Sequence, residues 1–191
     1  MKLDPMFEEL PDLIQPPGSA VRTILDVGTG YGVPACWLVQ RYPGASIFGI
    51  EPEPGRVRVA NLAIGANGRV VPGAAPDLPL STDKANAAFM LDMCHYLDDP
   101  SFEMTLKGLY RRMKSDGRLV IRAVMEPRRR LPWCWWWENF KMSWKRMPSH
   151  YRSVERVRKI LGQNGFQVIE TKDSGNRQEL VWIIATPLPR Y

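Results

Sequence analysis

The chain has 191 residues, of which 45% are hydrophobic and 24% charged, which is the profile of one globular domain and excludes a disordered chain. Its three cysteines lie far apart and form no Cys-x-x-Cys pair, so we expect neither a disulfide framework nor a bound structural metal. The sequence shows no secretory signal and no stretch long enough to cross a bilayer. We therefore expect a cytoplasmic protein, which could still be peripheral to a membrane.

The net charge of +6 is unevenly distributed along the chain. Residues 128–159 contain ten Arg or Lys and two acidic residues, so this segment carries +8 and the rest of the chain −2. A local basic patch indicates a local anionic partner more than a general affinity for nucleic acid.

The first 126 residues alternate β-rich runs with helical patterns, after a weak helical pattern over residues 3–15. We expect strands at residues 21–27, 45–50, 69–71, 85–91 and 118–125. We expect helices at residues 34–42, 54–65 and 101–114. Strands and helices that alternate at this spacing form βαβ units, whose right-handed crossovers build a parallel sheet.

The end of the chain departs from this alternation. A helix capped by Ser153 should end near Gln163, and two further strands should follow at residues 166–171 and 180–186. The link between these strands, residues 172–179, is too short for a helical crossover and contains Ser-Gly-Asn. We therefore expect a hairpin whose last strand is antiparallel to its neighbour.

These elements predict an α/β fold class: a doubly wound, Rossmann-like sheet of seven strands, mostly parallel with an antiparallel last strand. The chain should form a single domain. Its expected parts are a core at residues 20–126, an insertion at 127–150, and a C-terminal helix and hairpin at 151–188.

The strongest motif directly follows the first predicted strand, where Asp26 precedes the alternating glycines Gly28, Gly30 and Gly32. Glycine lets a ligand approach the backbone closely, and the next helix offers free N–H groups and a partial positive charge. That environment suits a carboxylate, whereas Asp26 suits an ammonium group. A ligand that carries both groups is an amino acid, and S-adenosylmethionine (AdoMet) is one.

A second acidic residue, Glu51, lies at the tip of the second predicted strand, where it can accept hydrogen bonds from ribose hydroxyls. A nicotinamide dinucleotide is the competing ligand. Its fingerprint needs a third glycine at position 33, which is Val33 here. The spacing therefore favours AdoMet.

The chain at this point resembles the class I AdoMet-dependent methyltransferases, especially small-molecule enzymes of the ubiquinone and menaquinone type. Five segments resemble the motifs of that family and occur in its order. They are ILDVGTGYG at 24–32, FGIEP at 48–52, VVPGAA followed by LP within 70–79, FMLDMCHYL at 89–97 and MKSDGRLVI at 113–121.

The resemblance implies a set of residues that hold AdoMet and its product S-adenosylhomocysteine. They are Asp26, Gly28, Thr29, Gly30, Gly32, Glu51, Pro52, Ala74, Ala75, Asp92 and Met93. In that arrangement Pro52 would lie against the adenine, and Asp92 and Met93 would line the floor beneath the sulfonium. The family often has an acid where this chain has Ala74, so Asp77 or a backbone carbonyl would have to contact the adenine amino group.

Methyl transfer requires two reactants to be positioned, and it requires a base only if the acceptor must lose a proton. His95, just past the fourth strand, is the best candidate base, although it can equally be a polar loop residue. His150, just before the last helix, is a second candidate.

Five of the seven tryptophans fall between Pro132 and Pro148, and large apolar residues there follow a helical period. We expect an amphipathic helix inserted after the fifth strand, which could pack on the core with a solvated basic face. The resemblance places such insertions over the acceptor pocket. Our preferred interpretation is therefore a substrate lid that includes Trp133, Trp136, Trp137, Phe140 and Tyr151.

The favoured function is methyl transfer to a small molecule, either hydrophobic, lipid-like or carrier-bound. The tryptophans and the basic residues also suit an anionic membrane surface or an acidic carrier protein. A nucleic-acid methyltransferase would use the basic patch on phosphates, but residues 92–95 contain no Asn-Pro-Pro-Tyr type motif. A catalytically inactive AdoMet-binding or regulatory protein gains some support from Ala74, whereas the intact glycine loop and Glu51 oppose it. The sequence does not predict the oligomeric state.

Overall fold

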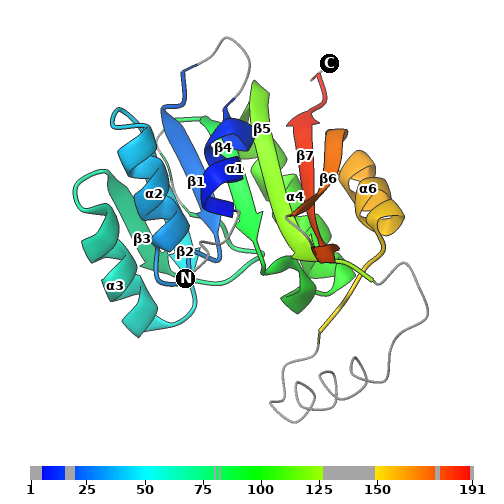
Figure 1. The fold of residues 1–191 in the computed structure, drawn as a ribbon, viewed down its shortest axis with the longest axis horizontal. Helices are drawn as coiled ribbons and strands as arrows, with labels where there is room; N and C mark the ends of the chain where they lie inside the picture. The colour runs from blue at the N-terminus through cyan, green and yellow to red at the C-terminus, as the bar shows by residue number, and fades with distance from the viewer. Residues whose placement is uncertain are drawn as a thin grey trace.

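The protein folds around one seven-stranded sheet with the strand order β3-β2-β1-β4-β5-β7-β6 (Figure 1). The structure is a computed structural model that describes residues 6–15, 20–79, 81, 83–126, 149–174 and 177–189. The strands are β1 (Thr23–Val27), β2 (Ser46–Glu51), β3 (Gly68–Pro72), β4 (Ala85–Leu91), β5 (Met113–Val124), β6 (Phe166–Ser174) and β7 (Arg177–Pro187). The helices are α1 (Met6–Ile14), α2 (Val33–Arg41), α3 (Pro54–Ile64), η1 (Cys94–Tyr96), α4 (Asp99–Arg112) and α6 (Val154–Gln163).

The sheet buries both of its faces, as the apolar composition of its central strands requires. Helices α1, α2 and α3 pack on one face through a buried cluster that includes Ile14, Leu38 and Ala60. Helices α4 and α6 pack on the other face through a cluster that includes Phe102 and Ile160. In Figure 1 the first group lies in front of the sheet. The predicted doubly wound, Rossmann-like α/β class is therefore confirmed.

Strand direction also agrees with the sequence. Strands β1 to β5 pair in parallel, and β7 runs antiparallel to both β5 and β6. Ser174 pairs with Arg177, so β6 and β7 form the expected hairpin. Both of its strands are longer than predicted, because polar residues of an edge hairpin face solvent and resemble a loop in sequence.

The predicted boundary between the helix at 101–114 and the next strand is also wrong, because α4 ends at Arg112. Strand β5 begins at Met113 and not at Arg118, because residues 115–117 are accommodated within the strand. Ala85 pairs with Met113 and Ala87 pairs with Arg118, so the extra residues lie in an irregularity of the β4–β5 ladder. The predicted Trp-rich helix falls within residues 127–148, which lie outside the described residues.

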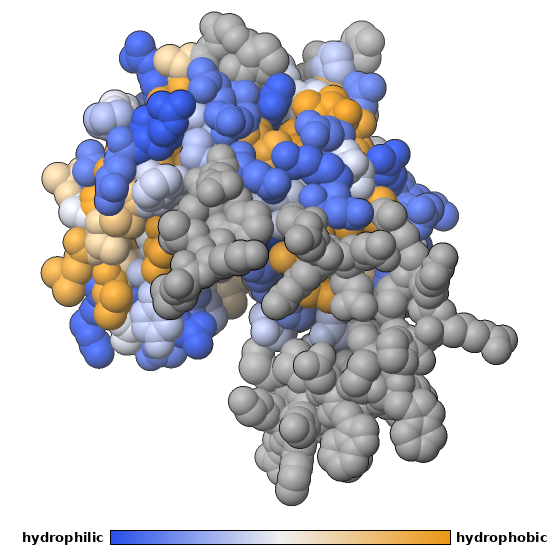
Figure 2. Space-filling model, viewed as in Figure 1, coloured by the Kyte–Doolittle hydropathy of each residue, from blue (hydrophilic) through white to orange (hydrophobic). Residues whose placement is uncertain are grey.

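The surface is mixed, and most of the residues that are coloured in Figure 2 are hydrophilic. Hydrophobic side chains also reach the surface there, at the left of the view over α3. The side chains of Val59 and Leu62 on that helix are exposed. No helix in the described part of the chain is long and apolar enough to cross a membrane.

Asn86 joins the start of β1 to β4 from inside the core. Its Oδ1 atom accepts hydrogen bonds from the backbone N–H groups of Arg22 and Thr23, both at 3.1 Å. Asn86 is buried in an otherwise apolar strand, and its bond to Thr23 is buried, so water could not readily replace Asn86 at the Thr23 N–H group.

We expect Asn86→Ala to lower the free energy of unfolding by about 2 kcal/mol, because it removes the acceptor of two backbone donors. Urea denaturation measures this change, and Gln163→Ala at an exposed site serves as the control. Equal unfolding midpoints for the two variants would show that Asn86 does not hold β1 in place.

Candidate functional site

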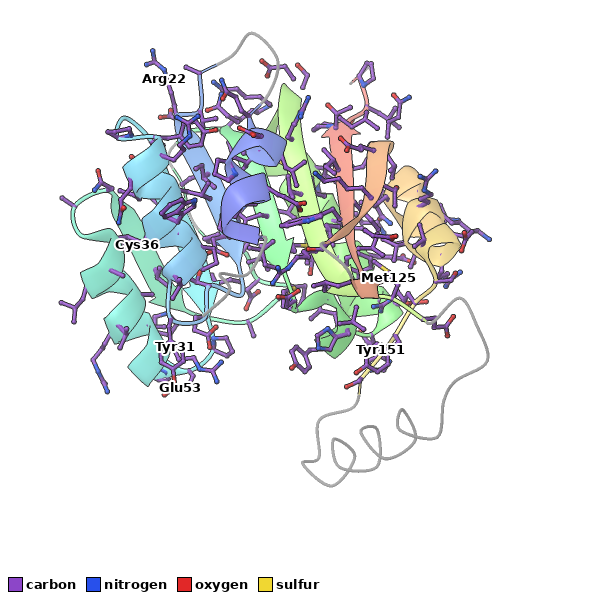
Figure 3. The ribbon with its side chains drawn as sticks, viewed as in Figure 1. Arg22, Tyr31, Cys36, Glu53, Met125 and Tyr151 are labelled. Carbon is purple, nitrogen blue, oxygen red and sulfur yellow. The ribbon has the colours of Figure 1, made fainter. Side chains whose placement is uncertain are left out.

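The carboxyl ends of β1 to β5 meet at one edge of the sheet, where an open α/β fold forms its ligand crevice. Figure 3 shows Tyr31, Glu53 and Tyr151 at this edge, while Arg22 lies at the opposite edge. The predicted site residues follow the tips of β1, β2, β3 and β4, so the topology brings them together.

The loop between β1 and α2 is a tight bend that needs glycine. Gly28, Gly30 and Gly32 have φ angles of 83°, 58° and 78°, a region that other residues rarely adopt. A Cβ atom at Gly32 would lie 2.8 Å from Cα of Ala60, so the N-terminus of α2 packs directly on α3. The bend is tied to β2, because the N–H group of Gly28 donates to the carbonyl of Ile50 at 3.0 Å.

Asp26 lies beneath this loop and is only 1% exposed. Its Oδ2 atom and Oγ1 of Thr29 are buried without a hydrogen-bond partner among the described residues. Burial raises the pKa of Asp26 to about 8; the Thr29 side chain opposes this shift and the nearby Glu51 carboxylate adds to it. An ammonium group would supply both the hydrogen bond and the charge that this carboxyl lacks.

Glu51, the last residue of β2, faces the same loop and is 4% exposed. Its Oε2 atom accepts from the N–H group of Gly30 at 2.9 Å, and Oε1 accepts from the N–H group of Glu53 at 3.2 Å. The guanidinium of Arg56 lies 3.7 Å from Oε1. Each carboxylate oxygen can accept a further hydrogen bond, so Glu51 remains able to receive ribose hydroxyls.

The loop after β3 runs beside Glu51, because the N–H group of Gly73 donates to the Glu51 carbonyl at 3.2 Å. Ala74 is exposed there, and Ala75 is half-buried against the core. Pro52, at the tip of β2, is also exposed. Asp77, considered as a substitute for the missing acid at 74, is exposed on the same loop.

The loop after β4 closes the site from the other side. A Cβ atom at Gly28 would lie 3.1 Å from Cγ of Met93, so Met93 packs on the first glycine of the bend. Asp92 has a φ of 54° and forms a two-point ion pair with Arg122, through Nε at 3.1 Å and through Nη2. The sequence analysis missed Arg122, although a charged residue in an apolar strand was the signal for a buried partner.

The backbones of the two candidate histidines are joined by a hydrogen bond. The N–H group of His150 donates to the carbonyl of His95 at 2.6 Å. The His95 ring is stacked on Tyr151, with centroids 5.7 Å apart and an interplanar angle of 10°. His95 is only 7% exposed, and its burial lowers its pKa, an effect that Asp92 opposes. His150 is exposed.

The remaining predicted lid residues, Trp133, Trp136, Trp137 and Phe140, lie outside the described residues. Tyr151 is described, and it contacts His95. Within the described ranges, no cluster of His, Cys, Asp or Glu could hold a metal ion.

The site fits the cofactor that the sequence predicts. Asp26 provides a buried acidic oxygen without a partner among the described residues, and Glu51 provides a carboxylate next to the bend. A Cβ atom at Gly30 would meet nothing within 4 Å, so the middle of the bend leaves room for a ligand. Together these residues suit an amino acid joined to a nucleoside.

Comparison with known proteins agrees with this geometry. Residues 24–117 match the family model described as a methyltransferase domain, and no curated protein matches the chain. The matched range contains the glycine bend, Glu51 and the loops after β3 and β4. Residues 24–117 are thus similar to a methyltransferase domain, and the glycine bend, Glu51 and the fold are those expected of a class I AdoMet-dependent methyltransferase. The ubiquinone and menaquinone subtype stays a prediction.

Several solved structures share the fold. Mitomycin 7-O-methyltransferase MmcR superposes with a TM-score of 0.74 at 16% identity, covering 95% of this chain and 54% of that chain. Human N-acetylserotonin methyltransferase in complex with SAM gives 0.73 at 19% identity, covering 96% and 52%. Geranyl diphosphate methyltransferase in complex with GPP and sinefungin gives 0.77 at 16% identity, covering 95% and 77%. The chain spans about half the length of the first two.

The raised pKa of Asp26 predicts a dependence of stability on pH. Between its ordinary value of 3.8 and about 8, the folded chain binds a proton at Asp26 that the unfolded chain has lost. The free energy of unfolding should therefore fall as the pH rises through this window, by up to about 1.4 kcal/mol per pH unit. Asp26→Asn should remove this contribution.

Urea denaturation of the ligand-free protein at several pH values between 5 and 9 measures the effect. Asp98→Asn is the matched control, because hydrogen bonds from Ser101 lower the pKa of Asp98, so its removal should not change the pH dependence between pH 5 and 9. Identical pH profiles for wild type and Asp26→Asn would refute the burial of an unpartnered carboxyl.

Proposed function

We propose that the protein transfers the methyl group of AdoMet to a small-molecule acceptor of hydrophobic character. One observation carries this proposal: the glycine bend after β1 is bonded to Glu51 and covers the buried carboxyl of Asp26. The names of the three structural neighbours support it, because each is a methyltransferase named for a small molecule. Fold alone does not define an activity, so the site must support the function.

In the proposed complex, each part of AdoMet has its own partner. The methionine carboxylate lies at the N-terminus of α2, where free backbone N–H groups favour an anion. The ammonium group pairs with Asp26, and the ribose hydroxyls bind Glu51. Pro52 lies against the adenine, near Ala74 and Ala75. Asp92 and Met93 lie below the sulfonium.

The sulfonium of AdoMet supplies an activated methyl group and a good leaving group. The protein contributes by placing the acceptor in line with that group, which removes most of the entropic barrier. Because burial keeps His95 neutral near pH 7, its imidazole is in the form that accepts a proton. An acceptor hydroxyl or amine that reaches this ring could lose its proton there.

The proposed hydrophobic acceptor rests on the residues at the β4 end of the crevice and on the sequence beyond them. Met93 and Tyr151 are partly buried, and the side chain of Tyr96 is 44% exposed. The proposed lid residues Trp133, Trp136, Trp137 and Phe140 would add apolar surface. A lipid-like or carrier-bound acceptor would share this chemistry.

The described part of the basic segment gives little support to a nucleic-acid acceptor. Arg152 and Arg156 both bind the carboxylate of Asp99, at 2.7 Å and 2.6 Å. Arg158 donates to the Thr171 hydroxyl at 2.7 Å. Arginines engaged in this way are poorly placed to neutralise phosphates.

The first test is titration calorimetry with AdoMet and with S-adenosylhomocysteine. We expect Glu51→Gln to weaken both ligands about tenfold or more, because hydrogen bonds to a charged acceptor contribute about 1.5–3 kcal/mol. Glu53→Gln is the control, since Glu53 is an exposed carboxylate that caps α3 two residues away. Wild-type affinity in Glu51→Gln would remove the ribose assignment, and failure of the wild type to bind AdoMet would remove the function.

The second test follows the methyl group itself. We expect purified protein with methyl-labelled AdoMet to label the organic-soluble fraction of a cell extract. Glu51→Gln should reduce this labelling at subsaturating AdoMet, because less cofactor is bound. Labelling of RNA alone, or cofactor binding without any transfer, would contradict the proposed acceptor class.

A further inference from the structure

The chain leaves the sheet after β5 and returns to it at residues 149–153, and these two segments are joined. The N–H group of Glu126 donates to the carbonyl of Arg152 at 3.0 Å. The returning segment is also bonded to η1, through the N–H group of His150 and the carbonyl of His95. The base of the insertion is therefore attached to the loop that carries His95.

The Arg152 side chain strengthens this attachment from inside the protein. Arg152 is 7% exposed, and its guanidinium makes four hydrogen bonds. The acceptors are Oδ1 of Asp99 at 2.7 Å and the carbonyls of Cys94 at 3.0 Å, Leu97 at 2.6 Å and His150 at 3.2 Å. The guanidinium also lies over the Phe102 ring, 5.0 Å from its centroid.

The backbone acceptors of Arg152 lie on both sides of His95, the candidate base. Cys94 begins η1 and Leu97 follows its end, so two of the four bonds hold the backbone on either side of His95. A third bond holds the returning segment, next to the Tyr151 ring that is stacked on His95. The fourth acceptor, Asp99, lies in the first turn of α4, where the helix dipole favours a carboxylate and so compensates the buried charge.

We propose that Arg152 is a positioning residue for the acceptor side of the site, where it fixes His95 and Tyr151 against each other. The inference rests on the proposed function only in calling the region of His95 and Tyr151 the acceptor side. The planar fork of arginine reaches several acceptors in fixed directions, and a lysine ammonium cannot reproduce this geometry. The cofactor side, built from β1 and β2, has no bond to Arg152 in the described contacts.

The two histidines allow a direct test, because His95 and His150 are the only ones in the chain. NMR titration of both imidazoles is carried out on wild type and on Arg152→Lys. We expect the midpoint of His95 to move upward in Arg152→Lys, because the loop opens and burial no longer lowers its pKa. His150→Gln in the wild-type background assigns the two signals.

Arg156→Lys is the matched control. Arg156 also binds Asp99, but it is about half-exposed and bonds to none of the three backbone carbonyls. It should therefore leave the His95 midpoint unchanged. If Arg152→Lys does not fold, Asp99→Asn takes its place, because it removes the charged partner of Arg152. Loss of the Asp99 charge alone would lower the His95 midpoint, so a raised midpoint would report that the loop opens. An unchanged His95 midpoint in the folded variant would overturn the proposal.

AdoMet calorimetry and labelled-methyl incorporation on the same proteins separate the positioning role of Arg152 from the proposed methyltransferase function. We expect Arg152→Lys to bind AdoMet with wild-type affinity and to label the organic-soluble fraction at least tenfold more slowly than Arg156→Lys. Equal labelling rates would overturn the positioning role. If wild type binds no AdoMet, the proposed function fails, while the His95 titration still decides whether Arg152 holds the loop.

Discussion

The site depends on the attachment of the glycine bend to the neighbouring strand. The Gly30 N–H group bonds to Glu51, and the N–H groups of Gly28 and Thr29 bond to the Ile50 carbonyl. A bend with three positive φ angles has few favourable contacts of its own, so the adjacent strand must stabilise it. The same contacts hold Glu51 at the edge of the sheet. One set of hydrogen bonds thus fixes both the backbone that would face the methionine and the carboxylate that would face the ribose.

The bend buries Asp26, and this burial lowers the stability of the ligand-free protein when the carboxyl is ionised. Burial of this carboxyl, whose Oδ2 atom has no partner among the described residues, destabilises its ionised form and so raises its pKa. A cationic ligand group that enters the site would stabilise the ionised carboxylate by pairing with its charge. Binding energy from the rest of the ligand can then favour the ionised carboxyl, so affinity and protonation are linked. A site of this kind favours a ligand that carries a cation, because only such a ligand stabilises the ionised form of Asp26.

The sequence predicted features made by residues close together in the chain better than contacts between residues far apart in the chain. The bend, its aspartate and Glu51 were predicted, because glycine spacing and strand order are local signals that parallel topology converts into proximity. The ion pairs were not. Arg122 binds Asp92 across 30 positions, and Arg152 binds Asp99 across 53. Neither separation matches the repeat of a helix or a strand, so no sequence pattern indicates the pair. The sequence analysis placed Arg152 in a basic patch, whereas the structure buries it. Partners of buried charges become visible only when the fold is known.

The two sides of the crevice are therefore built on different principles. The proposed cofactor side combines the backbone of the glycine bend after β1 with the carboxyl groups of Asp26 and Glu51, and the bend tolerates little change because its geometry depends on glycine. The proposed acceptor side includes two buried arginines, Arg122 on β5 and Arg152 on the returning segment, whose side chains bind residues at and after the end of β4. Side-chain attachments at the base of an insertion hold its ends in place whatever sequence lies between them. Attachments of this kind would allow the proposed insertion to differ between acceptors, while His95 and the cofactor would keep their positions.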